Sequence, residues 1–374
     1  MHRLSIIFIL FASLSFVPGG GFVLRAQEMK VRHGLESPRH LYDTDTVTIC
    51  FMGDMMMHSA QLAKARCNDG SYDFGTYFKY IGNRIEAADI AVANMEFTLA
   101  GEPFSGYPAF SAPDSYAEYL AVCGFDVFLC ANNHIFDRRS TGAERTLEIY
   151  GKLEREHGIR YTGLAADQED MKRGTPLILL SNGIRIGFIN MTYGTNLGSD
   201  ESWPKTNYIG NTERLEQALE QAETEAEVTI ALPHWGNEYE LLHSPGQEMT
   251  AEWLAECGAD AIIGCHPHVI QDTASVAGVP VAYSLGNAVS NMSAADTQLE
   301  LLLTMKVVRE SDGDIHILPF ELTYLWCSRP GGFNSSYTVI PVEEFIGSRD
   351  SWTGAWEYDK MIATYERVKK THNK

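Results

Sequence analysis

Short apolar runs alternate with amphipathic stretches from about residue 47 onward. The runs that have the length of buried strands are 47–52, 90–93, 126–131, 185–190, 228–233, 259–263 and 279–284. The stretches with helical spacing between them are 115–123, 141–157, 212–226 and 247–257. Strands that alternate with helices of this size predict an α/β domain with a largely parallel or mixed sheet.

The chain beyond residue 298 follows a different pattern. Segments 299–308 and 315–323 alternate around a Ser-Asp-Gly-Asp turn, which predicts an antiparallel hairpin. No repeat or Pro/Ser-rich linker divides the chain, so one domain over 45–345 and a C-terminal helical appendage over 346–374 are expected. Segments 100–113 and 193–211 are long and loop-like, and loops of this length usually serve a site.

The first 26 residues predict a secretory signal peptide. Arg3 precedes the apolar run 4–17, and small residues lead to an exit at Ala26. The alternative is an uncleaved membrane anchor, but the run is shorter than the roughly 20 residues that span a bilayer. We therefore expect export to the periplasm or the cell exterior, with membrane contact only if this segment is retained.

Composition and charge exclude several classes of protein. The 374 residues are 45% hydrophobic, which disfavours disorder, and 49 acidic against 29 basic residues give a net charge of −20. This charge is unsuited to a phosphate backbone, so nucleic acid is not an expected partner. The seven cysteines are odd in number and form no Cys-x-x-Cys pair, so mostly free core thiols are favoured over a disulfide framework.

Polar groups follow the predicted strands at their carboxyl ends. They are Asp54 with His58, Asn94 and Glu96, Asn133 and His134 with Asp137, His234 to Glu238, and His266 with His268. The carboxyl ends of strands in an α/β sheet line a common crevice, so these groups should converge. Taken singly, several have simpler explanations as turn or capping residues, and His58 could be a ligand, a hydrogen-bond donor to a ligand or a surface residue.

The collected donors are carboxylate and amide oxygens and imidazole nitrogens, which suit Mn, Fe or Zn better than Ca or Mg. Three histidines and two carboxylates exceed what one tetrahedral ion needs. Two ions that share a carboxylate would use them all, and such a pair can clamp the attacking and leaving oxygens of a phosphoryl transfer. His134 directly follows Asn133, so its ring could be displaced from the metals and either protonate a leaving group or steady a phosphate oxygen.

These motifs resemble the CapA (PgsA-type) family, named for poly-γ-glutamate capsule biosynthesis, over about residues 47–345. The matching motifs are Phe51-Met52-Gly53-Asp54, Ala93-Asn94-Met95-Glu96, Ala131-Asn132-Asn133-His134, His234-Trp235-Gly236-Asn237-Glu238-Tyr239, Gly264-Cys265-His266-Pro267-His268 and Tyr283-Ser284-Leu285-Gly286-Asn287. The family looks like a branch of the calcineurin-like metallophosphoesterases. The resemblance therefore implies a four-layer αββα sandwich of the metallo-dependent phosphatase type with a dinuclear metal site.

The resemblance also implies roles for individual residues. Asp54 and His268 would bind the first metal, Glu96 would bridge, and Asn133, His234 and His266 would bind the second. His134 and Asp137 would be catalytic, while His58 and Asn94 would bind metal or support its ligands. Residues expected to contact substrate are Tyr107, Thr195, Asn196, Trp235, Glu238 and Asn287. The sequence departs from the superfamily in two ways, because no histidine stands two residues after Asp54 and Glu replaces the bridging Asp.

The sequence is compatible with three functions. The first is an exported metal-dependent hydrolase, in which a metal-bound hydroxide attacks a small anionic, phosphorylated or γ-glutamyl substrate and His134 acts as the acid. The second is a non-catalytic envelope assembly or tethering factor, working in a capsule synthesis complex. The third is a sugar- or peptide-binding module that keeps the fold without the reaction.

Overall fold

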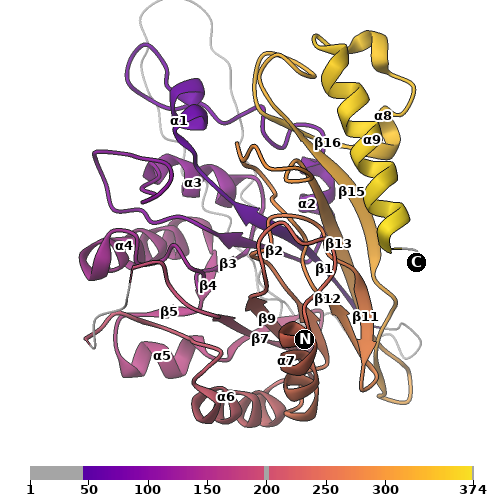
Figure 1. Ribbon diagram of the computed structural model, residues 1–374. Helices are drawn as coiled ribbons and strands as arrows, with labels where there is room; N and C mark the ends of the chain where they lie inside the picture. The colour runs from indigo at the N-terminus through magenta and orange to yellow at the C-terminus, as the bar shows by residue number, and fades with distance from the viewer. Residues whose placement is uncertain (1–44, 198–201, 373–374) are drawn as a thin grey trace, which may run out of the picture. The chain divides into compact units, whose positions relative to one another are not determined.

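The computed structural model describes residues 45–197 and 202–372, and two β-sheets form its centre (Figure 1). The first sheet has the order β16-β15-β13-β1-β2-β3-β4, and β14 pairs with β13. Its strands are β1 (Asp45–Met55), β2 (Ile90–Met95), β3 (Val127–Leu129), β4 (Arg160–Thr162), β13 (Leu299–Arg309), β14 (Ile315–Ile317), β15 (Glu321–Ser328) and β16 (Thr338–Pro341). The strands from β1 to β4 are parallel, and β13, β15 and β16 extend the sheet antiparallel.

The second sheet has the order β11-β12-β10-β9-β7-β6. Its strands are β6 (Leu177–Ser181), β7 (Ile184–Thr192), β9 (Val228–His234), β10 (Ala261–Ile263), β11 (Thr273–Val276) and β12 (Val279–Ala282). Strands β7, β9, β10 and β12 run parallel, while β6 and β11 pair antiparallel at the two edges. A separate short ladder joins β5 (Leu164–Ala165) to β8 (Lys205–Thr206).

The helices pack against the two sheets. They are α1 (Ser59–Ala65), α2 (Gly82–Ala87), α3 (Asp114–Val122), α4 (Arg139–His157), α5 (Gln168–Gly174), α6 (Thr212–Glu225), α7 (Pro245–Glu256), α8 (Val342–Phe345) and α9 (Ala355–His372), with a 3₁₀ turn at Arg349–Ser351. Helix α7 begins at Pro245, and the local sequence explains this start. Ser244 and Gln247 form a capping box around the first turn, and proline is favoured at the first helical position.

Three apolar clusters separate the layers. Strand β1 shows the principle, because Val47, Ile49 and Phe51 enter the cluster between the two sheets while Cys50 and Met52 face the first helical layer. The cluster that contains Cys50 and Met52 is completed by side chains of α1 to α4. A third cluster lies between the second sheet and helices α6 and α7. The expected α/β class and four-layer αββα sandwich are therefore confirmed.

The C-terminal helix α9 takes part in the core. Tyr358, Met361, Tyr365 and Val368 recur every three or four residues and join the cluster between the sheets, and α9 contacts β13 and β15 (Figure 1). Met361 and Val368 are fully buried. The helix thus covers the part of the first sheet that lies beyond β1.

The predicted strands and helices are present, with ends that differ by a few residues. The hairpin after residue 298 is present as β13 and β14, but its second arm is not one strand. It breaks between β14 and β15 at Leu318-Pro319-Phe320, because proline has no N–H to donate to the ladder.

Other predictions fall partly or wholly on chain that the structure does not describe. The predicted signal segment 1–26 lies outside the described residues. Within the described ranges, no helix has the length and apolar character needed to cross a membrane.

All seven cysteines are described and free, and Cys50, Cys130, Cys265 and Cys327 are buried, as expected for core thiols.

Candidate metal centre

The polar groups that the sequence places after strands do converge, but they come from both sheets. Asp54, Glu96 and His134 follow or end strands of the first sheet, and His234 and His266 belong to the ends of β9 and β10 in the second. A backbone hydrogen bond ties the end of β1 to the segment that follows β12, since the Asp54 N–H donates to Gly286 O at 3.0 Å. The carboxyl ends of the two sheets therefore meet at one site.

A bulge in β1 places Asp54. The pairing of β1 with β2 shifts between Met52 and Asp54, so Gly53 is the extra residue. A Cβ atom at Gly53 would lie 1.8 Å from Gly286 O, which only glycine avoids. Glycine at position 53 is therefore required by the close approach of the Gly286 segment to β1.

One donor group consists of Asp54, Glu96 and His268. Each offers one ligand atom, and these atoms lie within 4.8 Å of one another. His268 Nδ1 is 3.2 Å from Asp54 Oδ2, and His268 Nε2 is 3.7 Å from Glu96 Oε1. Asn94 Nδ2 donates to Asp54 Oδ1 at 2.6 Å, so Asn94 orients the carboxylate.

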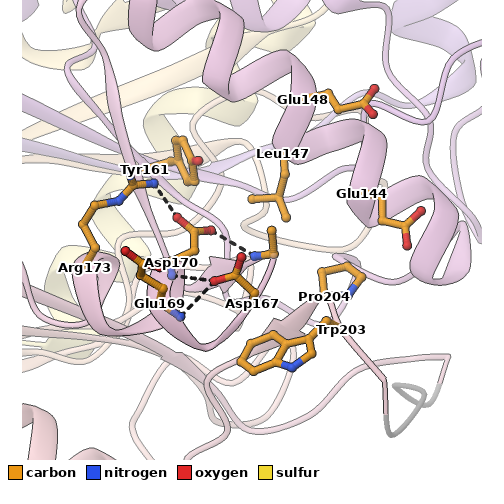
Figure 2. Close-up of a pocket in the computed structure, with 11 residues that line it drawn as sticks. Glu144, Leu147, Glu148, Tyr161, Asp167, Glu169, Asp170, Arg173, Trp203 and Pro204 are labelled. Atoms are coloured by element: carbon orange, nitrogen blue, oxygen red, sulfur yellow. Dashed lines mark hydrogen bonds and ion pairs between the residues drawn. The ribbon is translucent and has the colours of Figure 1, made fainter.

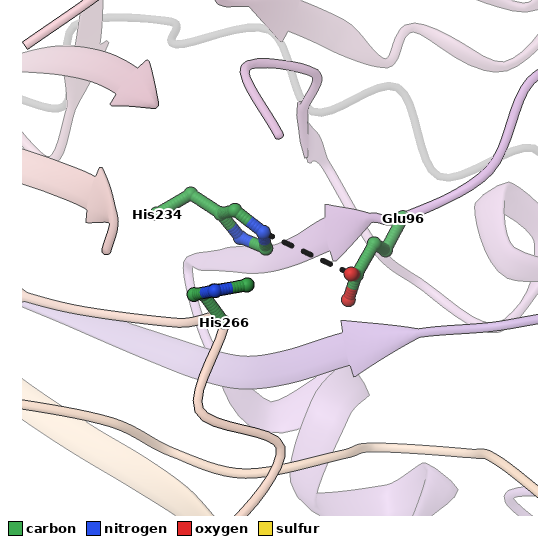
Figure 3. Close-up of side chains that lie close together, drawn as sticks. All are labelled: Glu96, His234 and His266. Carbon is green, nitrogen blue, oxygen red and sulfur yellow. Dashed lines mark ion pairs between the residues drawn. The ribbon is translucent and has the colours of Figure 1, made fainter. Parts of the chain in front are cut away.

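A second donor group consists of Glu96, His234 and His266 (Figure 3). His234 Nε2 lies 3.8 Å from Glu96 Oε1, and Asn133 Oδ1 lies 2.9 Å from the same nitrogen. The two groups share Glu96, the residue expected to bridge. The structure thus brings together all six residues that were predicted as metal ligands.

The centre fits divalent cations because three of its buried donor atoms lack hydrogen-bond partners. Both oxygens of Glu96 and the Nδ1 atom of His266 have no hydrogen-bond partner among the described residues, although both side chains are buried. A buried carboxylate without a partner is costly unless a cation neutralises it. Ligands about 2 Å from a common ion stand roughly 3–4 Å apart, which is the spacing observed here.

Burial sets the protonation of these groups in the metal-free chain. Burial, followed by the neighbouring His268, lowers the pKa of His266 to about 3, and burial with the nearby His266 lowers the pKa of His234 well below its usual value. Both rings are therefore neutral, which is the form that binds metal. Burial and the charge of Asp54 raise the pKa of Glu96 well above its usual value.

His134 and Asp137 form a pair beside the donor groups. His134 Nδ1 lies 2.7 Å from Asp137 Oδ2, which also accepts from the backbone N–H of Phe110 at 2.8 Å. His134 Nε2 is 3.8 Å from Glu96 Oε1. The imidazole therefore has one nitrogen held by a carboxylate and the other directed at the centre.

His58 and Asn94 occupy different places. Asn94 Nδ2 also lies 3.2 Å from His234 Nδ1, so Asn94 contacts residues of both groups. His58 is the N-cap residue of helix α1, and its Nδ1 accepts from the backbone N–H of Asn291 at 3.2 Å. His58 belongs to none of the donor groups formed by the described residues, so it does not replace the missing histidine.

The residues predicted to contact substrate divide into exposed and buried sets. Tyr107 is 72% exposed, and Glu238 is also exposed. Asn196 Nδ2 lies 3.3 Å from His134 Nδ1, and Thr195 contacts the Tyr208 hydroxyl at 3.2 Å.

Two of the predicted contacts are buried. Trp235 donates its indole N–H to Tyr283 O. Asn287 Oδ1 lies 2.9 Å from His268 Nδ1, which places Asn287 behind a ligand and in position to orient it.

Two aromatic residues at the site did not stand out in the sequence as site residues. The ring of Tyr193 is 4.6 Å from that of His266, and the ring of Phe110 is 4.7 Å from that of His134. Both lie in the long loops that were expected to wall the site, and this loop length was the only signal that could have found them.

Two cavities differ in their relation to the centre. One of about 250 Å³ is lined by Tyr193, Trp235 and Asn237 and adjoins the centre. The other, of about 650 Å³, is lined by α4, α5 and Trp203, with Asp167, Asp170 and Arg173 hydrogen-bonded within its wall (Figure 2). It includes none of the predicted site residues.

Residues 48–292 match the family described as bacterial capsule synthesis protein PGA_cap. The chain belongs to this family. A capsule biosynthesis protein CapA of Bacillus anthracis is 23% identical over 292 residues, covering 75% of this chain and 68% of that protein. The PGA biosynthesis protein CapA of Bacillus subtilis is 23% identical over 299 residues, covering 77% of this chain and 75% of that protein.

Solved structures show a weaker likeness to this PGA_cap chain. A Staphylococcus aureus protein described as a 5′-nucleotidase has a TM-score of 0.49 at 14% identity. The alignment covers 74% of this chain and 54% of that protein, so the chain spans about half its length.

Proposed function

We propose that this PGA_cap protein is an exported, metal-dependent hydrolase of the phosphoesterase type that acts in capsule biosynthesis. The observation that carries this proposal is Glu96, a buried carboxylate whose two oxygens have no hydrogen-bond partner among the described residues and which is shared by two donor groups. Its substrate would be a small anionic molecule, phosphorylated or γ-glutamyl.

The protein groups would hold two divalent ions, of Mn, Fe or Zn. Asp54, Glu96 and His268 would bind one, and Glu96, Asn133, His234 and His266 the other. When bound, the ions would supply positive charge that stabilises the attacking and leaving oxygens. They would also reverse the local sign of an acidic protein, so that an anionic substrate could approach.

The remaining residues would position these ligands and move a proton. Asp137 would accept from His134 Nδ1 and so fix the ring, leaving Nε2 to donate a proton to the leaving group. Asn94 would orient Asp54, and Asn287 would orient His268 through its second nitrogen. Partners of this kind usually affect metal affinity as well as geometry.

The proposal is tested by metal analysis and activity together. Purified protein is assayed with Mn²⁺ or Zn²⁺ on p-nitrophenyl phosphate, bis-p-nitrophenyl phosphate and γ-glutamyl p-nitroanilide, and its bound metal is measured before and after His266→Ala. We expect bound transition metal, its loss in the variant and hydrolysis of at least one compound. Bound metal without hydrolysis would favour the assembly or binding role, and metal content unchanged by the variant would refute the centre itself.

A further inference from the structure

A third group of donors stands at the mouth of the centre. It consists of Glu238, His266 and His268, whose ligand atoms lie within 4.8 Å of one another. The two histidines belong to different groups of the centre, and Glu238 is exposed while both rings are buried. Glu238 therefore lies beside one histidine of each donor group, and it is the exposed member of the three.

The backbone holds Glu238 in this place. The N–H of Tyr239 donates to Pro267 O at 2.8 Å, which joins the loop after β9 to the His266-Pro267-His268 turn. Tyr239, His266 and His268 have φ of 68°, 101° and 59°, values that side-chain-bearing residues rarely adopt. Such strain persists where the surrounding structure enforces it, so the two loops are fixed against each other.

Buried amides support the chain that follows Glu238. Gln271 Nε2 donates to Glu240 O at 2.9 Å and to Leu242 O at 3.1 Å, and Gln247 Nε2 donates to Gln271 Oε1 at 2.7 Å. Gln247 and Gln271 are both buried. The backbone that follows Glu238 is thus held at Tyr239, Glu240 and Leu242, although the side chain of Glu238 is exposed.

The two proposed metal positions differ in their number of protein donors. One has Glu96, Asn133, His234 and His266, whereas the other has Asp54, Glu96 and His268. The superfamily histidine that would complete the set of Asp54, Glu96 and His268 is absent. His58 does not replace it, because His58 is engaged at the start of α1. His266 Nδ1 is buried without a hydrogen-bond partner among the described residues, and its ring belongs to the donor group that contains Glu238.

We propose that Glu238 is a metal ligand that completes the set formed by Asp54, Glu96 and His268. This inference rests on the proposed function, because it requires that the centre binds two ions. Glu238 adds a third carboxylate, and oxygen-rich donor sets suit Mn²⁺ better than tetrahedral Zn²⁺. Because this ligand is the exposed one, it is the protein group that an incoming anion can displace.

The test measures metal binding and uses no substrate. Metal-free full-length protein is titrated with Mn²⁺, and the free ion is followed by electron paramagnetic resonance. The variants are Glu238→Gln and Glu238→Asp, and Glu240→Gln is the matched control, since Glu240 is exposed in the same loop and belongs to no donor group of the described residues. Thermal melts of the metal-free variants check that the fold is kept.

We expect two ions per wild-type chain, with Glu238→Gln weakening one of them about 10–100-fold and leaving the other unchanged. The Mn²⁺ affinity of Glu238→Asp should lie between those of the wild type and Glu238→Gln. The affinity of Glu240→Gln should match that of the wild type. Two ions bound to Glu238→Gln with wild-type affinity would overturn the role of Glu238 while leaving the proposed function intact. A wild-type chain that binds no ion would refute both.

Discussion

Glu300 is a buried carboxyl group that the proposed chemistry does not use. It lies on β13 between Leu299 and Leu301, which point into the cluster between the sheets, so Glu300 points to the other face of the strand, toward the helical layer. Neither of its oxygens has a hydrogen-bond partner among the described residues. Burial, followed by the charge of Asp54, raises its pKa well above the usual 4.5. Glu300 is therefore expected to make stability depend on pH.

We predict that Glu300→Gln stabilises the metal-free protein near neutral pH. The folded state holds the proton more tightly than the unfolded state, so the contribution of Glu300 is present below pH 4.5 and is lost as pH rises toward the folded pKa. The loss is about 1.4 kcal/mol per pH unit in that window. Urea unfolding at pH 5, 6 and 7 measures it, with the exposed Glu310→Gln as control. Equal pH slopes in wild type and Glu300→Gln would contradict the prediction.

Asp137 is expected to affect the rate of hydrolysis through His134. If it fixes the His134 ring, Asp137→Asn should lower kcat by about 10²–10⁴-fold, because general acid catalysis contributes that much. Bound metal should not change, since Asp137 belongs to no donor group of the described chain. Steady-state kinetics on the hydrolysed compound and metal analysis of the same sample separate the two effects. Loss of metal with kcat would instead indicate a structural role.

At the scale of elements, the β1 bulge determines where Asp54 stands. Gly53→Ala would force a Cβ against Gly286 O, so we expect a loss of about 1–3 kcal/mol in the free energy of unfolding together with weaker metal binding. Gly82→Ala is the control, because a Cβ at this first residue of α2 meets no atom within 4 Å. Urea unfolding compares the two variants, and equal stability would show that the close approach is not required.

Strands and helices with strong periodicity were predictable, and weaker ones were not. The apolar runs of β1, β7 and β9 and the spacing of α4 were visible in the sequence. Short elements such as α1, α5, β6 and β16 were missed, because their few apolar residues become informative only when partners cover them. The break between β14 and β15 could have been predicted from Pro319.

At the scale of the molecule, α9 is expected to be part of the folded unit. Met361→Ala should cost about 2–5 kcal/mol of unfolding free energy, because Met361 is fully buried in the cluster between the sheets. Glu366→Ala, on the exposed face of the same helix, should change stability by less than about 0.5 kcal/mol. Chemical denaturation measures both, and a Met361→Ala variant as stable as wild type would show that α9 packs independently of the core.

The candidate site was predictable as a set of residues but not as a geometry. The rule that ligands gather at the carboxyl ends of strands identified Asp54, Glu96, His234, His266 and His268. That rule concerns a single sheet, whereas these residues come from two sheets whose ends meet. The resemblance to a two-sheet family implied this arrangement, and the pairing of strands established it.

The sequence by itself determined which segments form strands and helices and which polar residues stand at their ends, because periodicity and chain order are local properties. Only the tertiary structure decided that the two groups share Glu96, that His58 is engaged elsewhere and that Glu238 meets His266 and His268. These contacts join segments up to 233 residues apart. They depend on how two sheets pack and on which backbone hydrogen bonds fix their loops, and no short stretch of sequence contains that information.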